Sequence, residues 1–235
     1  MRPEVLAEVM EATWPPARLH HVPGFVLRDG AGGGKRVSAA TALHGWNADN
    51  LALAEAAMCE LGQEPLFAIR AGNEALDQVL AARGYDIIDP VIAYAMPADG
   101  FAAPGWMTSF PHWPPMAVAR EIWAAGGIDG ARLAVMDRVG GAKTAILARS
   151  GDRASGVAFV ALHGEAAMLH ALEVNAGQRR QGSAQNILAA AAQWTLAQGG
   201  STLSLVVTVA NAGARALYEK CGMTAVGQYH YRSLT

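Results

Sequence analysis

The sequence predicts an α+β protein with a mixed sheet, and two observations indicate this class. Short apolar segments of strand length alternate with longer segments in which apolar residues recur at helical spacing. One strand–helix–strand pattern also occurs twice, since Asn73 and Gly84 lie 138 positions before Asn211 and Gly222. The repeat indicates two related halves, each a mainly antiparallel sheet with flanking helices. Such units are common, so the repeat alone also fits a chance match.

The first half is expected to hold three helices separated by short strands. Val5, Val9 and Met10 lie at helical spacing and predict the first helix. Gly62 and Gly84 follow the other two helical segments, where helix C-caps favour glycine. The expected elements, in order, are a helix at 3–13, strands at 25–28 and 36–43, a helix at 49–61, a strand at 66–70, a helix at 73–83 and a strand at 85–96.

A proline-rich segment at 98–115 follows this half. Because proline lacks a backbone N–H and fixes φ, the segment is predicted to form a linker without a regular element. Its aromatic residues indicate that it packs against the protein. The segment divides a domain at 1–97 from a second domain at 116–235. The residues behind this interpretation are Pro104, Trp106, Phe110, Pro111, Trp113, Pro114 and Pro115.

The second half is expected to alternate strands and helices more regularly. Its longest helix contains four consecutive alanines from Ala189, which favour helix and allow close packing on a sheet. Asn211 suits the N-cap of the last helix. The expected elements, in order, are helices at 116–125 and 128–138, strands at 144–149, 156–162 and 168–174, a helix at 182–198, a strand at 203–209, a helix at 211–221 and a strand at 224–232.

Composition and charge exclude several classes of protein. Hydrophobic residues make up 52% of the 235 residues, and 18 basic against 20 acidic side chains leave no excess for a general nucleic-acid surface. Cys59 and Cys221 fit a reducing compartment and lack metal-ligand spacing, so we expect no metal. The acidic start does not suit a signal peptide, and no apolar run is long enough for a membrane span. We therefore expect a soluble, cytoplasmic protein.

The turn from Arg179 to Ala184 carries the first candidate site. Here the chain leaves a strand and enters a helix, whose N-terminus offers free N–H groups and a partial positive charge. Gly182 and Ala184 leave room for a phosphate to approach the backbone. Arg179 and Arg180 add charge, and Ser183 adds a hydroxyl. An ordinary strand–helix loop with solvated arginines is the alternative for the turn taken alone.

The helix that begins at Asn211 carries the second candidate site. Ala214 and Tyr218 lie three and seven residues further on, so all three residues share one face. A ligand crossing this face would meet an amide, a small apolar side chain and then a phenol. A packing role for Tyr218 with a satisfied hydroxyl is the alternative.

Together these segments resemble the GNAT superfamily of acyl-CoA-dependent N-acetyltransferases. Arg179-x-x-Gly182-x-Ala184 resembles the family's pyrophosphate motif, and the strand at 172–174 resembles its splayed fourth strand. Asn211-x-x-Ala214-x-x-x-Tyr218-x-x-x-Gly222 resembles its second signature. Ala176 stands where many relatives have proline. The resemblance is clear over 116–235. The first half looks like a degenerate copy, so the whole chain resembles tandem GNAT proteins with one working site.

The resemblance implies that acetyl-CoA binds between the strands ending at Val174 and Val209 and that its acetyl group passes directly to an amine. Tyr218 would be the general acid for the leaving thiolate, and Glu173 is the preferred general base, with His170 and Glu165 as alternatives. In a regular strand His170 and Glu173 would face opposite sides. The implied acetyl-CoA contacts are Leu172, Val174, Arg179, Arg180, Gln181, Gly182, Ser183, Ala184, Asn211 and Ala214.

The acceptor is expected to be a small-molecule or peptidyl amine entering from the side opposite the CoA tail. The aromatic residues near 106–123 could form an apolar acceptor pocket or join the two halves, and the second reading is favoured. The competing hypothesis for the protein is a non-catalytic acyl-CoA sensor or scaffold. Since edge strands of this fold often pair, a homodimer is left open, and neither nucleic acid nor membrane is expected as a partner.

Overall fold

The computed structural model describes residues 1–234, which form one eight-stranded mixed sheet, a three-stranded sheet and seven α-helices. The large sheet has the order β4-β11-β5-β10-β9-β8-β7-β6, and every neighbouring pair except β9–β10 is antiparallel. Its strands are β4 (Leu66–Ile69), β5 (Asp86–Pro97), β6 (Ser109–His112), β7 (Lys143–Ser150), β8 (Arg153–His163), β9 (Ala166–Val174), β10 (Thr202–Thr208) and β11 (Thr224–Ser233). The small sheet contains β1 (Arg18–Val22), β2 (Phe25–Asp29) and β3 (Thr41–Ala42). The predicted α+β fold class is confirmed.

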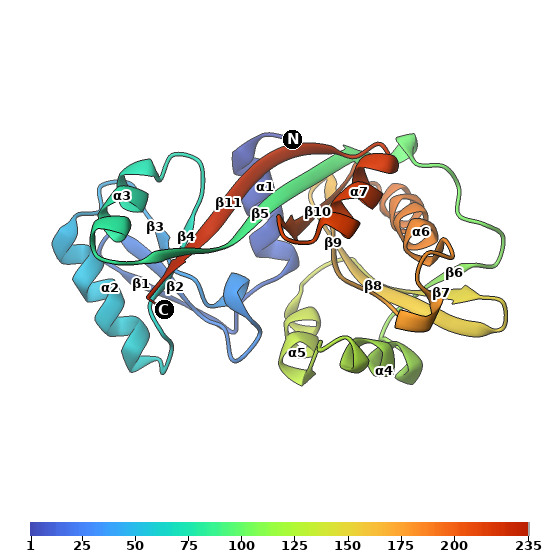
Figure 1. Cartoon of the computed structure of the whole chain (residues 1–235), viewed down its shortest axis with the longest axis horizontal. Helices are drawn as coiled ribbons and strands as arrows, with labels where there is room; N and C mark the ends of the chain where they lie inside the picture. Colours follow the sequence, from blue (N-terminus) through green and yellow to red (C-terminus); the bar gives the residue numbers. More distant parts are fainter. Residues whose placement is uncertain (235) are drawn as a thin grey trace.

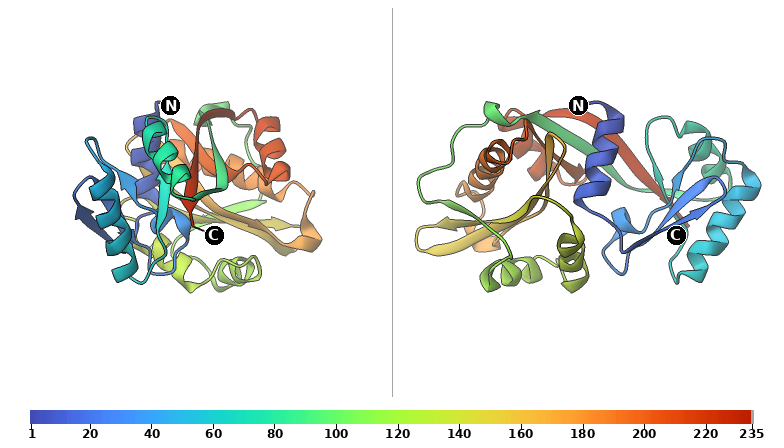
Figure 2. Two further views of the ribbon diagram at one scale, coloured as in Figure 1. Left: turned by 60° about the vertical axis from the view of Figure 1, so that its left-hand side comes forward. Right: turned by 180° about the vertical axis from the view of Figure 1, so that it is seen from behind.

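Figure 1 shows an elongated molecule in which α1 lies near the middle and the other helices gather toward the two ends. At one end α2 and α3 cover the small sheet and β4, and at the other α4, α5, α6 and α7 surround β6–β10. The long strands β5 and β11 run between the two ends (Figures 1 and 2). The helices are α1 (Pro3–Thr13), α2 (Ala48–Glu60), α3 (Glu74–Ala82), α4 (Ala117–Ala125), α5 (Gly130–Arg138), α6 (Ser183–Ala197) and α7 (Ala212–Lys220).

The two halves of the sequence exchange strands in the large sheet. In the first half β4, α3 and β5 follow one another, and in the second half β10, α7 and β11 do the same. β11 lies between β4 and β5, while β5 lies between β10 and β11. Each half therefore receives the last strand of the other. Strands on the two sides of the predicted boundary at residue 98 are thus hydrogen-bonded in one sheet, and the division into domains stays a prediction.

The repeat extends beyond these two units. An isolated parallel bridge joins Ala40 to Phe67, before and after α2. The parallel pairing of β9 with β10 occupies the same place in the second half, before and after α6. In both halves a helix therefore lies between two segments that pair in parallel, a likeness that the sequence repeat did not specify.

Three elements differ from the sequence-based prediction. β1 was not predicted, because its polar residues form an edge strand with little apolar signal. The prediction of a strand at 36–43 is mostly wrong. The chain forms a 3₁₀ turn at Lys35–Val37, and only the two residues of β3 are strand. The prediction that prolines exclude regular structure from 98–115 is also wrong. β6 forms there at the edge of the sheet, where the missing N–H of Pro111 is tolerated.

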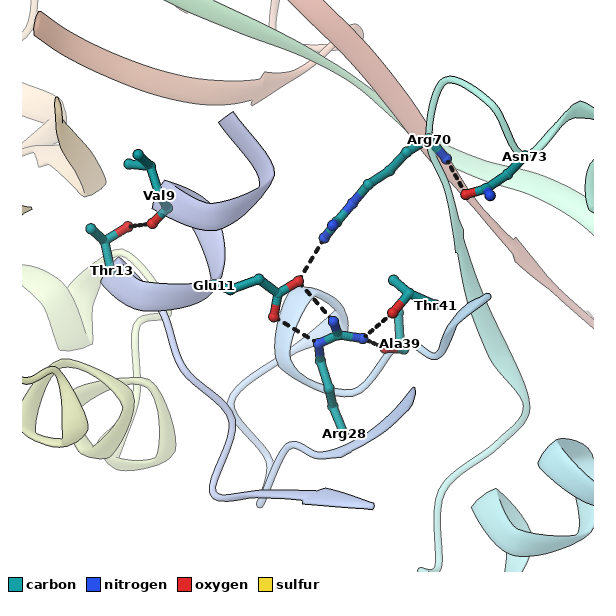
Figure 3. A network of polar contacts seen from close by, with 8 residues as sticks. All are labelled: Val9, Glu11, Thr13, Arg28, Ala39, Thr41, Arg70 and Asn73. Atoms are coloured by element: carbon teal, nitrogen blue, oxygen red, sulfur yellow. Dashed lines mark hydrogen bonds and ion pairs between the residues drawn. The ribbon is translucent and has the colours of Figure 1, made fainter. Parts of the chain in front are cut away.

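Helix α1 connects the two halves. Its apolar residues Leu6, Val9 and Met10 are buried in a cluster with Met168 of β9 and with residues of β11. Its Glu11 faces the first half instead, where it meets two arginines (Figure 3). One helix thus packs its apolar residues in a cluster drawn from both halves and makes a charged contact with the first.

The Glu11 carboxylate is the centre of a partly buried polar network. It accepts hydrogen bonds from Arg28 Nε and Nη2 at 3.0 and 2.7 Å, and from Arg70 Nη2 at 2.8 Å (Figure 3). Arg28 Nη1 donates to the carbonyl of Ala39 at 2.8 Å and to Thr41 Oγ1 at 3.2 Å. Burial alone would raise the pKa of Glu11, but the charges and hydrogen bonds of Arg28 and Arg70 outweigh it and lower that pKa.

Replacing Glu11 by glutamine is expected to lower the free energy of unfolding at pH 7 by about 2 kcal/mol. The reason is that the Arg28 side chain, which is 6% exposed, keeps its charge and loses its carboxylate partner. Because the pKa of Glu11 is lowered on folding, its stabilisation is present above the ordinary value of 4.5 and is lost as the pH falls through the folded value. Urea unfolding at several pH values measures the difference.

Glu8→Gln is the matched control, since Glu8 lies exposed on the same helix. This variant should unfold with nearly the wild-type free energy. Equal losses in the Glu8 and Glu11 variants would show that helix charge, and not the arginine network, accounts for the effect.

No helix within residues 1–234 is long and apolar enough to cross a membrane.

Candidate active site

The site lies where β9 and β10 separate. The two strands pair in parallel only from Ala166 to Leu169 and from Thr202 to Leu205. Beyond this point each strand continues, β9 to Val174 and β10 to Thr208, without further pairing between them. The separation exposes backbone groups of both strands, which is the splayed geometry expected for the strand at 172–174.

A bulge in β9 marks the beginning of the separation. The pairing of β9 with β8 shifts between His170, opposite Phe159, and Glu173, opposite Val157. Ala171 in this bulge has φ +52°, a left-handed conformation that few residues other than glycine adopt. The indole Nε1 of Trp123 donates a hydrogen bond of 2.8 Å to the Ala171 carbonyl, so helix α4 holds the bulge in place.

The bulge places His170 and Glu173 on the same side of β9. Their partners on β8, Phe159 and Val157, are two residues apart and therefore share a face. In a regular strand His170 and Glu173 would face opposite sides. The bulge adds one residue between them, so both side chains face the same side. Both side chains thus lie on the face that α4 and α5 cover.

His170 is buried and fully engaged in hydrogen bonds. Its Nε2 lies 2.9 Å from Thr13 Oγ1, and its Nδ1 lies 2.9 Å from Arg36 Nη1. Thr13 donates its hydroxyl proton to the Val9 carbonyl at 2.6 Å, and a guanidinium can only donate. His170 must therefore be neutral with its proton on Nε2. Burial, with a smaller contribution from the Arg36 charge, lowers the pKa of His170 well below its ordinary value. His170 has no free lone pair with which to act as a base.

The turn between β9 and α6 has the geometry of an anion cradle. Arg180 and Gly182 have φ values of +63° and +87°, and α6 begins at Ser183 immediately afterwards. No side chain caps α6, so the N–H groups of its first turn remain for a ligand. A Cβ atom on Gly182 would meet nothing within 4 Å, which means that the space above this backbone is open.

Side chains around the turn have differing roles. The Ser183 hydroxyl donates to or accepts from Ser155 Oγ at 2.8 Å and is buried, so Ser183 stays a predicted acetyl-CoA contact through its backbone. Gln181 Oε1 accepts a hydrogen bond from Ser150 Oγ at 2.9 Å, and Gln181 does not line the cleft described below. Arg179 is exposed and reaches the Val174 carbonyl through Nε at 3.2 Å.

Helix α7 forms the opposite wall. Asn211 caps it as predicted, because its side chain accepts a hydrogen bond of 3.1 Å from the Ala214 N–H. The Asn211 side-chain oxygen is therefore engaged within the helix. Ala214 presents a small side chain to the cleft, and Tyr218 follows one turn later.

A cleft of about 650 Å³ brings these elements together. It is lined by the end of β9, the turn and first residues of α6, and one face of α7. Every predicted site residue except Gln181 lines it: Leu172, Glu173, Val174, Arg179, Arg180, Gly182, Ser183, Ala184, Asn211, Ala214 and Tyr218. The cleft also contains residues that were not predicted to act: Gln185, Gly213, Leu217 and Lys220. The helical spacing of residues after Asn211 and after Gly182 is the signal that could have identified some of these four residues.

Tyr218 lies at the base of the cleft with 5% of its surface exposed. Its ring packs at 5.9 Å from the ring of Tyr94, a residue of β5 from the first half. Burial, with a smaller contribution from Cys221, raises the pKa of Tyr218 to about 12. The phenol is therefore protonated at neutral pH, as a proton donor must be.

Glu173 lies at the edge of the cleft. Its Oε1 accepts a hydrogen bond from Arg179 Nη2 at 3.3 Å, and 22% of its side chain is exposed. A Cβ atom on Gly126 would lie 2.6 Å from the Glu173 Cδ, so a side chain at the end of α4 would displace this carboxylate from its position. Water can therefore reach the carboxylate.

A smaller cavity of about 260 Å³ occupies the related position in the first half. It is lined by Ala42, Leu43, His44, Gly45, Trp46, Gly72 and Asn73. It lacks the arginines and the tyrosine of the larger cleft. Within residues 1–234 no group of three or more His, Cys, Asp or Glu side chains is placed to hold a metal ion.

Comparison with known proteins agrees with this geometry. Residues 116–223 match the family model described as Acetyltransferase (GNAT) family. No curated protein was found to match the sequence. Several solved structures share the fold over nearly the whole chain at low identity.

A GCN5-related N-acetyltransferase from Kribbella flavida is 18% identical, with 98% of this chain and 95% of that chain covered and a TM-score of 0.69. A functionally unknown conserved protein from Staphylococcus epidermidis is 10% identical, with 94% and 95% covered and a TM-score of 0.70. A tandem GNAT protein from the clavulanic acid biosynthesis pathway is 13% identical, with 96% and 86% covered and a TM-score of 0.61. The chain therefore has the GNAT fold, and residues 116–223, which carry most of the cleft, match the model of the GNAT acetyltransferase family.

Proposed function

We propose that this protein transfers an acetyl group from acetyl-CoA to an amine in the cleft between β9, α6 and α7. The proposal rests on one observation: the uncapped N-terminus of α6 and the protonated Tyr218 line the same cleft. The family match supports acyl transfer from an acyl-CoA donor.

The residues of the cleft fit the parts of acetyl-CoA. The free N–H groups that begin α6, with Arg179 and Arg180, suit the pyrophosphate. The end of β9 near Leu172 and Val174 is unpaired on the edge that faces β10, and this edge suits the amides of the pantetheine arm, which would pair with it as an added strand does. Ala214 leaves room where the arm would cross α7.

The reaction needs two proton transfers in addition to the new bond. The amine nitrogen forms a bond with the acetyl carbonyl carbon, and the carbon–sulfur bond breaks. The departing thiolate, with a reference pKa of about 8.5, takes a proton from Tyr218. The amine loses its proton to Glu173, directly or through water. No covalent bond to the protein forms.

Two measurements on the whole protein test the proposal. Acetyl-CoA should raise the melting temperature, and free CoA should be released when a mixed panel of amines is added. Stabilisation by acetyl-CoA without release on any amine would favour the alternative of a non-catalytic acyl-CoA sensor or scaffold. If no CoA species stabilises the protein, both hypotheses fail.

Replacing Glu173 by glutamine is expected to lower kcat roughly tenfold. The expected loss is moderate because water reaches a side chain that is 22% exposed and can accept the proton instead. Steady-state kinetics at saturating acetyl-CoA measure the effect.

Arg179→Gln is the matched control, since it breaks the same ion pair and retains the carboxylate. It should raise the KM for acetyl-CoA and leave kcat nearly unchanged. Equal losses of kcat in both variants would assign the effect to the ion pair and remove Glu173 from the role of base.

A further inference from the structure

A second cavity of about 410 Å³ lies on the other side of the β9 bulge. It is lined by His170 and Ala171 of β9, by residues of β5, β10, β11 and α5, and by the segment 33–36 of the first half. The two cavities lie at neighbouring residues of β9, because Ala171 lines this one and Leu172 lines the cleft between β9, α6 and α7. An amine held here would reach the separated strands from the side opposite the first cavity.

The cavity has an excess of positive charge. Lys35 and Asp89 form an ion pair of 2.5 Å at its exposed rim. Arg36 and Arg132 also line the cavity, and within residues 1–234 neither forms an ion pair with a carboxylate. His170 is neutral, as its hydrogen bonds require. Two guanidinium charges are therefore left without a counter-charge.

Arg36 is held in a fixed position. Its Nη1 donates to His170 Nδ1 at 2.9 Å, and its guanidinium lies 5.8 Å from the centre of the Trp14 ring. The Trp14 ring stacks on His170 at 4.8 Å, and His170 in turn is anchored to Thr13. The Nε atom of Arg36 is buried and has no hydrogen-bond partner among the described residues. An unpaired buried donor is unfavourable, and a water or a ligand that paired with it would relieve that cost.

Arg132 completes the cationic part of the cavity from the other half of the sequence. A Cβ atom on Gly34 would lie 3.7 Å from Arg132 Nε, so the start of α5 lies against the loop that carries Arg36. The remaining wall is aromatic and apolar: Trp14, Tyr229, Tyr231 and Val206. The cavity thus combines an anion-binding end with an apolar wall.

We propose that the acceptor amine carries an anionic group, a carboxylate or a phosphate, which Arg36 and Arg132 bind in this second cavity. This inference rests on the proposed acetyl transfer. His170, the partner of Arg36, lies only two residues before Leu172 of the cleft, with the bulge at Ala171 between them. An acceptor whose anionic group binds Arg36 and whose amine lies at the separated strands therefore needs only a short spacer between the two groups. His170 is a positioning residue that orients Arg36.

Matched pairs of amines test the anionic group and its identity. Phenylalanine is compared with phenethylamine, and phosphoethanolamine with ethanolamine, by CoA release from the wild-type protein. The anionic member of at least one pair should have a kcat/KM at least tenfold higher, and the pair that responds distinguishes carboxylate from phosphate. Equal kcat/KM values within both pairs would overturn the proposal.

Arg132→Gln should remove this preference by raising the KM of the anionic amine about tenfold, with kcat and the neutral amine little affected. Arg132 is exposed, so the variant is expected to fold. Arg120→Gln, on the exposed face of α4, removes the same charge outside the cavity and should keep the preference. Equal effects of the two variants would assign the preference to overall charge and overturn the site.

A binding measurement separates this proposal from the proposed function. Calorimetry with the four amines reports on the second cavity even where no CoA is released. Binding of an anionic amine that Arg132→Gln abolishes, and Arg120→Gln does not, supports the site independently of turnover. No binding of any anionic amine by a protein that acetyl-CoA still stabilises would overturn the anion site and leave the acyl-CoA cleft standing.

Discussion

Tyr218→Phe is expected to lower kcat by on the order of 100-fold or more, with little change in the KM for acetyl-CoA. The variant keeps the ring that packs against Tyr94 and removes only the hydroxyl at the base of the cleft. Since the pKa of Tyr218 is raised to about 12, the lost group is one that holds its proton throughout the neutral range. Steady-state CoA release with an accepted amine measures kcat and KM separately.

Tyr94→Phe is the matched control for this experiment. Tyr94 contacts the same ring, but its hydroxyl donates to Glu219 Oε1 at 2.7 Å and does not line the cleft. This variant should lose about 1 kcal/mol of stability and keep nearly the wild-type kcat. If turnover survives Tyr218→Phe unchanged, Tyr218 is not the acid, and equal losses in both variants would indicate a packing effect.

The parts of the site that lie close together in sequence could be predicted from it. The Arg179–Ala184 turn and the cap at Asn211 depend on neighbouring residues. Glycine allows the left-handed backbone of the turn, and the asparagine side chain accepts a hydrogen bond from the start of the helix. Both features are found where the sequence placed them. Helix bounds such as Pro3–Thr13 are confirmed for the same reason, because apolar spacing is a local signal.

The exchange of β5 and β11 was not predicted. Both strands are apolar enough to lie inside a sheet, but periodicity describes which face is buried and not which strand lies beside which. The consequence for the site is direct: Tyr94, which packs against Tyr218, comes from a strand assigned to the other half. The first half therefore contributes to the cleft through packing.

The arrangement around Ala171 also escaped prediction, because no residue type there marks a bulge. Alanine seldom adopts φ +52°, and the conformation is held by a hydrogen bond from Trp123, which lies 48 residues earlier. The same bulge brings His170 and Glu173 to one face and separates the two cavities. The anion-binding cavity in turn depends on Arg36 and Arg132, which lie 96 residues apart in a sequence that gives no sign of their meeting.

Gly182→Ala is expected to weaken acetyl-CoA binding by roughly 10- to 100-fold, the loss of about 1.5–3 kcal/mol that one or two charge-assisted hydrogen bonds contribute. Gly182 has φ +87° at the start of α6, where a side chain is strained and where its Cβ would occupy open space above the N–H groups of the turn. If the backbone of the variant relaxes, the turn moves away from its present position. If the backbone keeps its conformation, the alanine methyl group lies where the pyrophosphate should approach. Calorimetry with acetyl-CoA measures the dissociation constant in either case.

Gly199→Ala separates the effect on the cradle from the effect on stability. Gly199 follows the other end of the same helix with φ +83°, and a Cβ there also meets nothing within 4 Å. Both substitutions should therefore lower the free energy of unfolding by a similar amount, about 1 kcal/mol, because both put a side chain into a left-handed conformation. Only Gly182→Ala should change the affinity for acetyl-CoA, since only Gly182 lines the cleft. Equal affinities in the two variants would mean that the N-terminus of α6 does not bind the pyrophosphate, and the arginines of the turn would then have to hold it without the helix.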